Sequence, residues 1–360
     1  MAEWFELLEA LAKIPAPSHH EEKRAEFCKR WLEDNGAEGV YIDEALNVVY
    51  PIGNMNGELV VIMAHSDVVF PDTEELPFYE EDGRIYCPGI GDDTAHVVAL
   101  LLSAKDIIEK GLVPKNGGVL LVVNSCEEGL GNLKGCRKIM ADYGGRVREF
   151  ITLDSCVGVI HNKTVGSRRY RIEIETEGGH SYQAFGNKNA IAVLAELITR
   201  LYRIEVPKIG KTTYNVGVIE GGTSVNTIAQ RAECLFEFRS DERCGLAAMQ
   251  RAFDEAISRT DGKVTVTLVG DRPCAGEVDA GRLEALVKRV ECAVKKYFDI
   301  EVKCSPGSTD CNIPSSMGIP AVCVGLFETK GAHRREEYVE YDSMVPGIEA
   351  AKEIIGHYFE

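Results

Sequence analysis

The sequence lacks any long uninterrupted apolar run. Its longest apolar stretches, such as Val97–Leu102, fall far short of the ~20 residues that a membrane-spanning helix needs. The first residues, MAEWFELLEALAKI, contain Glu3, Glu6 and Glu9 and lack the basic start and apolar centre of a secretory signal. We therefore expect a cytoplasmic protein that does not span a membrane.

Positive charge is also scarce. The 360 residues include 40 Lys and Arg but 57 Asp and Glu, so the formal net charge is −17. Because nucleic acids and anionic membranes attract basic surfaces, this balance argues against both as partners. The 45% of hydrophobic and 27% of charged residues are typical of a folded globular protein, and the length suggests two domains.

Paired cysteines are absent, because none of the 12 cysteines belongs to a CxxC motif. Several lie singly in apolar strand patterns, as Cys234 and Cys323 do. This argues against a structural zinc site built from cysteines and predicts reduced, mostly buried thiols. We also considered a nucleophile at Cys126, Cys156 or Cys311, but the sequence shows no Cys–His pairing at a recognisable spacing.

Short, continuous apolar runs are present and alternate with helical segments in the first part of the chain. The strands that we predict at 59–64, 119–124 and 150–153 contain no charged residue. Such runs are typical of a parallel or mixed sheet that is buried on both faces.

Two local signals mark helix ends. The pattern Ser18-x-x-Glu21 predicts a capping box at the start of a helix that ends near Asn35. Gly111 predicts the end of a second helix, which begins near Thr94. These helices alternate with the apolar strands, which is typical of an α/β domain.

Residues 167–274 follow a different pattern. Their strands alternate polar and apolar residues, as in YRIEIET at 170–176, and two helices are interleaved in the order βαββαβ. This order is that of a ferredoxin-like unit with one exposed sheet face. We therefore predict an α/β fold, a mixed sheet flanked by helices, formed by residues 1–166 and 275–360. The segment 167–274 would be an inserted α+β domain.

Acidic and histidine residues gather where the predicted strands end. In chain order these are His65, Asp67, Asp92, Glu127, Glu128, Asp154 and His333. Open α/β sheets place ligands at the carboxyl ends of their strands, so we expect these side chains at one rim. Several carboxylates there would repel one another unless cations neutralised them. Carboxylates and imidazoles without thiolates suit Zn²⁺, Mn²⁺ or Co²⁺.

Five motifs resemble those of the M20 metallopeptidase family: HSD at 65–67, GIGDD at 89–93, CEEG at 126–129, LDS at 153–155 and the late His333. The resemblance covers nearly the whole chain and is closest to peptidase T-like tripeptide aminopeptidases. It implies a zinc-exopeptidase-like fold with an inserted lid and dimerisation domain. It also implies two divalent metal ions, most simply zinc with manganese or cobalt possible, which activate a water as the nucleophile.

The resemblance assigns the metal ligands position by position. It implies that His65 and Asp154 bind one metal ion. Glu128 and His333 would bind the second ion, and Asp92 would bridge the two. In this family the peptide bond after the bridging aspartate, here to Asp93, is often cis.

Two further acidic residues act on the ligands and on the reaction. The resemblance implies that Asp67 orients the imidazole of His65. Glu127 would be the general base that takes a proton from the water and passes it to the leaving amine. The split between Glu127 and Glu128 makes physical sense, because a ligand is held by its metal while its neighbour stays free to move a proton.

The remaining candidate residues concern the substrate. In the family the histidine that matches His180 reaches the active site of a partner subunit, so the resemblance implies a homodimer through the inserted domain. Asn226 would face the substrate and Arg239 would contact its carboxylate, while Ser308 and Thr309 belong to a second substrate loop. For the residues of the inserted domain, a purely structural role in surface turns remains open.

Two positions depart from the common pattern of the family. Asn312 stands where an arginine often follows the aspartate of the second substrate loop, here Asp310. Without that arginine a bidentate clamp for a C-terminal carboxylate is missing, which argues against strict carboxypeptidase activity. Thr94 stands where many members have lysine, so the charge near the bridging aspartate differs as well.

Three functions remain in competition. The sequence favours a two-metal exopeptidase that cleaves the peptide bond of short peptides. An N-acyl amino acid amidohydrolase, or a carboxypeptidase, would use the same metal centre. A non-catalytic metal-binding protein is the third reading, but the presence of Glu127 and of every ligand argues against it.

Overall fold

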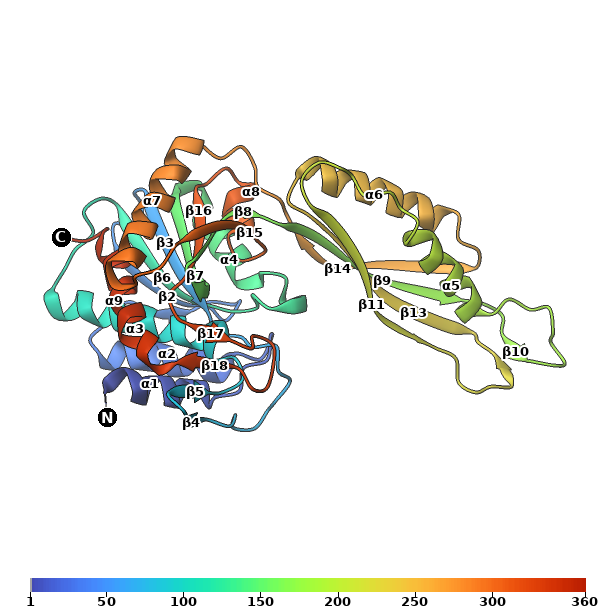
Figure 1. Cartoon of the computed structure of the whole chain (residues 1–360), viewed down its shortest axis with the longest axis horizontal. Helices are drawn as coiled ribbons and strands as arrows, with labels where there is room; N and C mark the ends of the chain where they lie inside the picture. The colour runs from blue at the N-terminus through green and yellow to red at the C-terminus, as the bar shows by residue number, and fades with distance from the viewer. Residues whose placement is uncertain (1) are drawn as a thin grey trace. The chain divides into compact units, whose positions relative to one another are not determined.

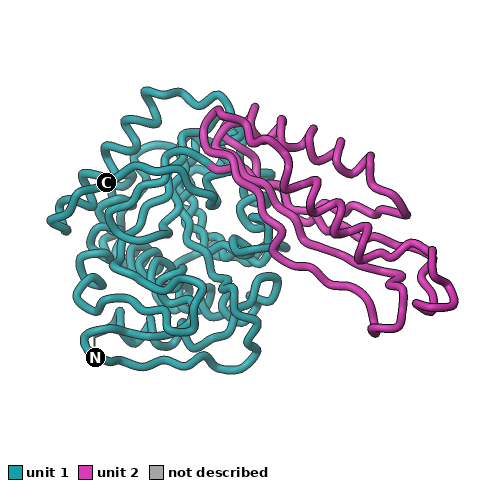
Figure 2. Tube along the Cα trace, turned by 45° about the vertical axis from the view of Figure 1, so that its right-hand side comes forward, with its two compact units in different colours: residues 1–164, 276–360 teal, residues 165–275 magenta. Residues whose placement is uncertain are grey.

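The computed structural model describes residues 2–360, which divide into two compact units (Figure 1 and Figure 2). Unit 1 comprises the residues up to Thr164 together with Gly276–Glu360, and unit 2 comprises Val165–Ala275. The chain therefore leaves unit 1 once and returns to it once. Within the described residues, none of the helices combines the length and apolar character that crossing a membrane requires.

Unit 1 is built on an eight-stranded mixed sheet. Its strands lie in the spatial order β1 (Tyr41–Ile42), β2 (Val48–Gly53), β6 (Gly118–Asn124), β3 (Leu59–His65), β7 (Val147–Val157), β16 (Ala321–Gly325), β8 (Val159–Thr164) and β15 (Lys303–Gly307). The four central strands β6, β3, β7 and β16 are parallel to one another, and β2 and β8 run antiparallel to them. The carboxyl ends of the central strands therefore meet at one edge.

Both faces of this sheet are buried, because helices cover each of them. Successive side chains of a strand point to opposite sides, so each strand contributes to both cores. On β3, Val60 and Ile62 enter one hydrophobic core, whereas Val61 and Met63 enter another. The helices on the first side are α1 (Glu3–Ala12), α2 (Glu22–Asp34), α3 (Ala95–Lys110), α7 (Ala280–Tyr297) and α9 (Met344–Gly356). Those on the second side are α4 (Lys134–Tyr143) and α8 (Asn312–Ser316). The predicted α/β fold is confirmed.

A small antiparallel sheet, which the sequence analysis did not predict, joins distant parts of unit 1. Its strands lie in the order β17 (Thr329–Lys330), β18 (Tyr338–Glu340), β5 (Arg84–Tyr86) and β4 (Tyr79–Glu81). Because β18 pairs with β5, the segment after Lys330 lies beside the segment that follows Tyr86. The candidate ligands His333 and Asp92 belong to these two segments.

Unit 2 is a four-stranded antiparallel sheet with two helices. The strands lie in the order β11 (Thr212–Gly221), β13 (Arg231–Ser240), β9 (Gly166–Glu175) and β14 (Lys263–Arg272). The helices α5 (Ala190–Leu201) and α6 (Arg243–Ser258) cover one face, which is why apolar and polar residues alternate along β13. A separate ladder joins β10 (Gly179–His180) to β12 (Thr227–Ile228). The main strands and helices follow the predicted βαββαβ order.

The helix signals differ in their outcome. Helix α3 ends before Gly111, whose φ of 60° gives the expected left-handed cap. The predicted capping box is wrong, because α2 begins at Glu22 and no side chain caps it. The Ser18 hydroxyl instead donates to Asp67, and Glu21 accepts a hydrogen bond from the backbone of a distant loop. Ser18 and Glu21 therefore form hydrogen bonds with residues near the ends of β3 and β6 instead of capping the helix.

The prediction that most of the thiols are buried is confirmed. All 12 thiols are free, and eight of them are buried, so most behave as small apolar side chains.

Candidate metal centre

The ends of three parallel strands bring the predicted ligands together. His65 is the last residue of β3 and pairs in register with Asn124, the last residue of β6. Glu127 and Glu128 follow β6 directly, and Asp154 lies on β7 two residues beyond its last pair with β3. The register of the sheet, rather than proximity in the sequence, therefore sets these positions.

Asp92 lies between two histidines. Its Oδ1 is 3.1 Å from Nε2 of His65, and its Oδ2 is 3.3 Å from Nε2 of His333. Oε1 of Glu128 lies 3.1 Å from the same nitrogen of His333. The peptide bond between Asp92 and Asp93 is cis, as the resemblance implies. One carboxylate thus faces both histidines, each with a different oxygen, which is the arrangement that a bridging ligand requires.

The donor atoms form three overlapping groups, and within each group they lie within 4.8 Å of one another. The groups are His65, Asp92 and Asp154; Asp92, Glu128 and His333; and His65, Glu127 and Glu128. The first two groups share only Asp92, so they describe two adjacent sites with one common carboxylate. Each combines one imidazole with two carboxylates, a donor set that suits Zn²⁺, Mn²⁺ or Co²⁺.

The electrostatics of the cluster also fit bound cations. Burial and the negative charge of Asp92 raise the pKa of Asp154 to about 7. Hydrogen bonds to Asp92 and Glu128 raise the pKa of His333 to about 10. In the metal-free protein, protons therefore compensate an excess of negative charge. Divalent cations among the same groups would compensate that charge in their place.

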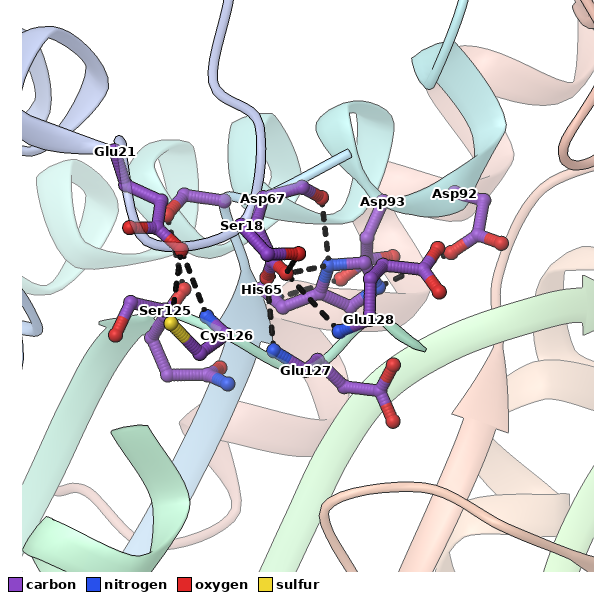
Figure 3. Close-up of polar contacts among 12 residues, drawn as sticks. Ser18, Glu21, His65, Asp67, Asp92, Asp93, Ser125, Cys126, Glu127 and Glu128 are labelled. Atoms are coloured by element: carbon purple, nitrogen blue, oxygen red, sulfur yellow. Dashed lines mark hydrogen bonds and ion pairs between the residues drawn. The ribbon is translucent and has the colours of Figure 1, made fainter. Parts of the chain in front are cut away.

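Asp67 connects the first histidine to the pair of glutamates, as Figure 3 shows. It is fully buried and accepts the backbone N–H groups of Glu127 and Glu128 at 2.9 and 3.0 Å. It also accepts the Ser18 hydroxyl at 2.6 Å. Nδ1 of His65 lies 3.0 Å from the backbone oxygen of Asp67, so its Nε2 is left to face Asp92. Asp67 therefore orients the ring of His65 and also holds the backbone of Glu127 and Glu128.

The second residue of the Asp–Asp pair supports the first from behind. Oδ2 of Asp93 accepts the backbone N–H of His65 at 2.9 Å, and its Oδ1 lies 2.5 Å from Nδ1 of His96. Nε2 of His96 accepts the backbone N–H of Leu326 at 3.1 Å. Burial lowers the pKa of His96 to about 3, so this imidazole stays neutral and links the turn to the end of β16.

The tertiary structure places Cys126 beside a histidine that is distant in the sequence. Its Sγ lies 3.4 Å from Nδ1 of His19 and 3.2 Å from Oε1 of Glu21. No spacing in the sequence indicates this pair, because 107 residues separate the two side chains. Burial and the nearby Glu21 raise the pKa of Cys126 to about 12, so the thiol stays protonated at neutral pH. This is the opposite of what a cysteine nucleophile needs.

Arg24 is a further residue that the sequence analysis missed. Among residues 2–360 no carboxylate lies within ion-pair distance of this buried guanidinium. Its Nη1 donates to the backbone oxygen of Ser66 at 2.9 Å and to the Thr94 hydroxyl at 3.1 Å. It thereby ties the end of β3 to the turn that carries Asp92. These partners lie 42 and 70 residues away in the chain, so no spacing rule could have found them.

The second substrate loop is anchored close to the same strand ends. Ser308 and Thr309 lie between β15 and α8, and the Thr309 N–H donates to the Asn312 side chain at 3.0 Å. The next residue, Asp310, accepts the side-chain N–H of Asn124 at 2.7 Å. Because Asn124 is the register partner of His65, this hydrogen bond holds the loop beside the metal cluster.

The three candidates of unit 2 do not all lie together. His180 pairs with Thr227, and the adjacent Ser181 N–H donates to the backbone oxygen of Asn226 at 3.0 Å. His180 and Asn226 therefore share one exposed tip, here called the β10–β12 tip. Arg239 lies near the far end of β13, eight residues or about 26 Å beyond the first residue of that strand. There its Nε donates to Glu237 at 2.9 Å.

Comparison with known proteins decides the family. The model of peptidase family M20/M25/M40 matches residues 61–357, which is most of the chain. The chain belongs to peptidase family M20/M25/M40. It is therefore a metal-dependent hydrolase of the exopeptidase and amidohydrolase class, and M20 enzymes typically hold two metal ions.

Known M20 proteins match over almost the full length. The chain is 27% identical over 369 residues to a peptidase M20 domain-containing protein of Schizosaccharomyces pombe, covering 97% of this chain and 83% of that protein. It is 25% identical over 362 residues to a putative succinyl-diaminopimelate desuccinylase of Mycobacterium tuberculosis, covering 98% and 97%. The crystal structure of a tripeptidase from Staphylococcus aureus has a TM-score of 0.75 at 21% identity, covering 99% and 97%. The last likeness shows the shared fold.

Proposed function

We propose that this M20 protein is a two-metal exopeptidase that cleaves the peptide bond of short peptides, in the manner of an aminopeptidase or tripeptidase. One observation carries the proposal. Two donor groups of the same composition share the single carboxylate of Asp92, whose two oxygens face His65 and His333. Adjacent metal sites of this kind serve hydrolysis, because they hold a water and a carbonyl oxygen side by side.

The proposed ligands follow from the donor groups. His65 and Asp154 hold the first ion, and Glu128 and His333 hold the second. Asp92 binds both. We propose zinc as the metal, with manganese or cobalt as alternatives, because the donors are nitrogen and oxygen without any thiolate.

Glu127 is the proposed general base. Bound metal ions would lower the pKa of a water and polarise the scissile carbonyl. Glu127 takes the proton of that water and passes it to the leaving amine. Its backbone N–H is fixed by Asp67, and its carboxylate lies in one donor group with His65 and Glu128. A base that is held this close to the ligands needs no large movement to reach the water.

Unit 2 is the proposed lid and dimerisation domain. The edge strand β11 is exposed along most of its length, so its free edge suits pairing with a second copy of the chain. His180 would stabilise the oxyanion in the partner's site, and its exposure on the β10–β12 tip supports a role away from its own unit. Asn226 on the same tip would contact the substrate.

The remaining substrate contacts are proposed at two other places. Ser308 and Thr309 would line the substrate site from the loop that Asp310 anchors beside the metal cluster. Arg239 would bind a substrate carboxylate, for which its hydrogen bond to Glu237 has to open.

An N-acyl amino acid amidohydrolase is the second candidate. The likeness to the putative desuccinylase extends over 98% of the chain, and that name describes removal of an acyl group. Asn312 stands where an arginine would help to bind a C-terminal carboxylate, and removal of an acyl group does not depend on that arginine. Both candidates use the same centre, so only the substrate distinguishes them.

The decisive experiment compares a free tripeptide with its N-acetylated twin. Zinc-loaded protein is incubated with each, with and without a chelator, and the products are identified by mass spectrometry. We expect loss of the first residue from the free peptide only, abolished by the chelator. Release of acetate would establish the amidohydrolase instead, and release of the last residue from the blocked peptide would establish a carboxypeptidase.

A further inference from the structure

A buried carboxylate lies directly behind the shared ligand. Glu337 is four residues beyond His333, and its side chain is only 1% exposed. Its Oε2 accepts the backbone N–H of Gly89 at 2.9 Å. Its Oε1 accepts the N–H groups of Gly91 and Asp92, both at 2.8 Å. One carboxylate therefore satisfies three backbone donors of the turn that presents Asp92.

The small antiparallel sheet fixes Glu337 in this place. Strand β18 starts at Tyr338, which pairs with Tyr86 at the end of β5. Cys87 follows β5 directly and Glu337 precedes β18 directly, and the Cys87 N–H donates to the backbone oxygen of Glu337 at 3.2 Å. The side chain thus projects into the turn from a position that the backbone of both strands determines.

The turn is shaped around this carboxylate. A Cβ atom added to Gly91 would lie 3.1 Å from Oε1 of Glu337 and 2.6 Å from the Thr329 side chain, so only glycine leaves room. Gly89 has a φ of 76°, in the left-handed region that favours glycine. Buried backbone N–H groups need acceptors, and here Glu337 is the acceptor for three of them.

We propose that Glu337 is a positioning residue that couples the two ligand segments of the second metal site. Its backbone continues from His333, while its side chain holds the backbone of Asp92. It thereby fixes the spacing of His333 and Asp92 and sets the metal affinity of the site that they form with Glu128. This inference rests on the proposed function, because it assumes that these residues bind metal.

The substitution Glu337→Gln tests this coupling with the smallest change of shape. A carboxylate accepts hydrogen bonds at both oxygens, whereas a carboxamide accepts at one and donates at the other. In the variant at least one of the N–H groups of the turn therefore faces an NH₂ group. The matched control is Glu336→Gln, which removes the same charge one residue earlier from an exposed side chain.

Metal affinity is the first readout. The metal-free wild type and both variants are titrated with Zn²⁺ in competition with a chromophoric chelator. We expect Glu337→Gln to bind one of the two ions about 10- to 100-fold more weakly, as is usual when a group that orients a ligand is lost. In the loaded enzyme kcat should fall by a similar factor, while KM stays within about 2-fold. Glu336→Gln should match the wild type in every respect.

Several outcomes would overturn the proposal. Wild-type metal affinity in Glu337→Gln would do so, even if the variant melted at a lower temperature, since a merely structural role would give that result. A second measurement needs no variant. In the metal-free wild type, the backbone amides of Gly89, Gly91 and Asp92 should exchange slowly with deuterium. Rapid exchange in the folded protein would refute their hydrogen bonds to Glu337. A wild type that binds no pair of ions would overturn the proposed function together with this inference.

Discussion

The metal cluster of unit 1 and the β10–β12 tip of unit 2 both carry a histidine proposed for the reaction, but they are built in opposite ways. His65 is 1% exposed, and Asp67 and Asp93 bind its ring and its backbone. His180 is exposed, and its Nδ1 accepts backbone N–H groups of its own turn, such as that of Tyr182 at 3.3 Å.

The difference separates the part of the molecule that holds buried ligands from the part that exposes a surface for contact. The proposed metal ligands and the proposed base Glu127 all lie within unit 1, so this part of the proposed site is preorganised by the fold of one unit. The tip instead exposes large apolar side chains, with Tyr182 at 87%, Phe185 at 90% and Val225 at 103% of full accessibility. Exposed apolar groups gathered in one place usually meet another surface. The tip therefore fits contact with another surface, such as the partner's site in which His180 is proposed to act.

The largest expected effect breaks the chemistry of the cluster without removing its metals. Glu127→Gln should lower kcat by about 10³-fold, because proton transfer by the base is lost. Bound metal, measured by elemental analysis, should stay at the wild-type level. Glu128→Gln should instead lose one ion, and equal metal loss in both variants would contradict the division of roles.

The second prediction concerns the tip. His180→Gln should lower kcat by about 10²-fold, the usual cost of losing one donor to a developing oxyanion. Metal content and melting temperature should not change, because the side chain is exposed. His20→Gln, another exposed histidine, is the matched control. Unchanged kinetics in His180→Gln would confine the reaction to unit 1.

The third prediction sharpens the contrast through Asp67. Asp67→Asn should lower metal affinity and kcat by about 10- to 100-fold, because an amide cannot accept both N–H groups of the glutamate pair as the carboxylate does. Asp72→Asn, which alters an exposed ion pair with Arg335, should have no such effect. Equal effects of the two substitutions would show that charge alone matters.

The fourth prediction uses pH on metal-free protein. The pKa of Asp154 is raised from 3.8 to about 7, so its protonated form stabilises the fold fully below pH 3.8. That contribution is lost as the pH rises through 7. The melting temperature of metal-free protein should therefore fall between about pH 4 and 7, whereas zinc-loaded protein should show a flatter profile. Identical profiles with and without zinc would be incompatible with metal binding at Asp154.

The smallest effect is expected at Arg239. Arg239→Gln should raise KM about 3-fold for substrates with a free carboxylate and leave kcat unchanged, because exposed ion pairs contribute little. A peptide amide should show no difference between the variant and the wild type. A large loss of kcat would place Arg239 in the reaction itself.

Much of the cluster was predictable because strand ends leave a clear trace in a sequence. Apolar runs end at His65, before Glu127 and before Asp154, and parallel strands bring such ends to one edge. The supporting residues left no trace of this kind. Ser18 suggested a helix cap and instead binds Asp67, while Glu337 was overlooked because its three partners are backbone amides about 245 residues away.

The sequence by itself determined the layered α/β fold, the order of strands and helices in the inserted segment, and the presence of acidic and histidine residues at the strand ends. Periodicity and residue type are local properties, so they can be seen without coordinates. Only the tertiary structure decided that Asp92 faces two histidines, that Cys126 stays protonated beside His19, and that Glu337 holds the turn behind the shared ligand. Those facts depend on sheet register and on burial, which bring together groups that the chain keeps far apart.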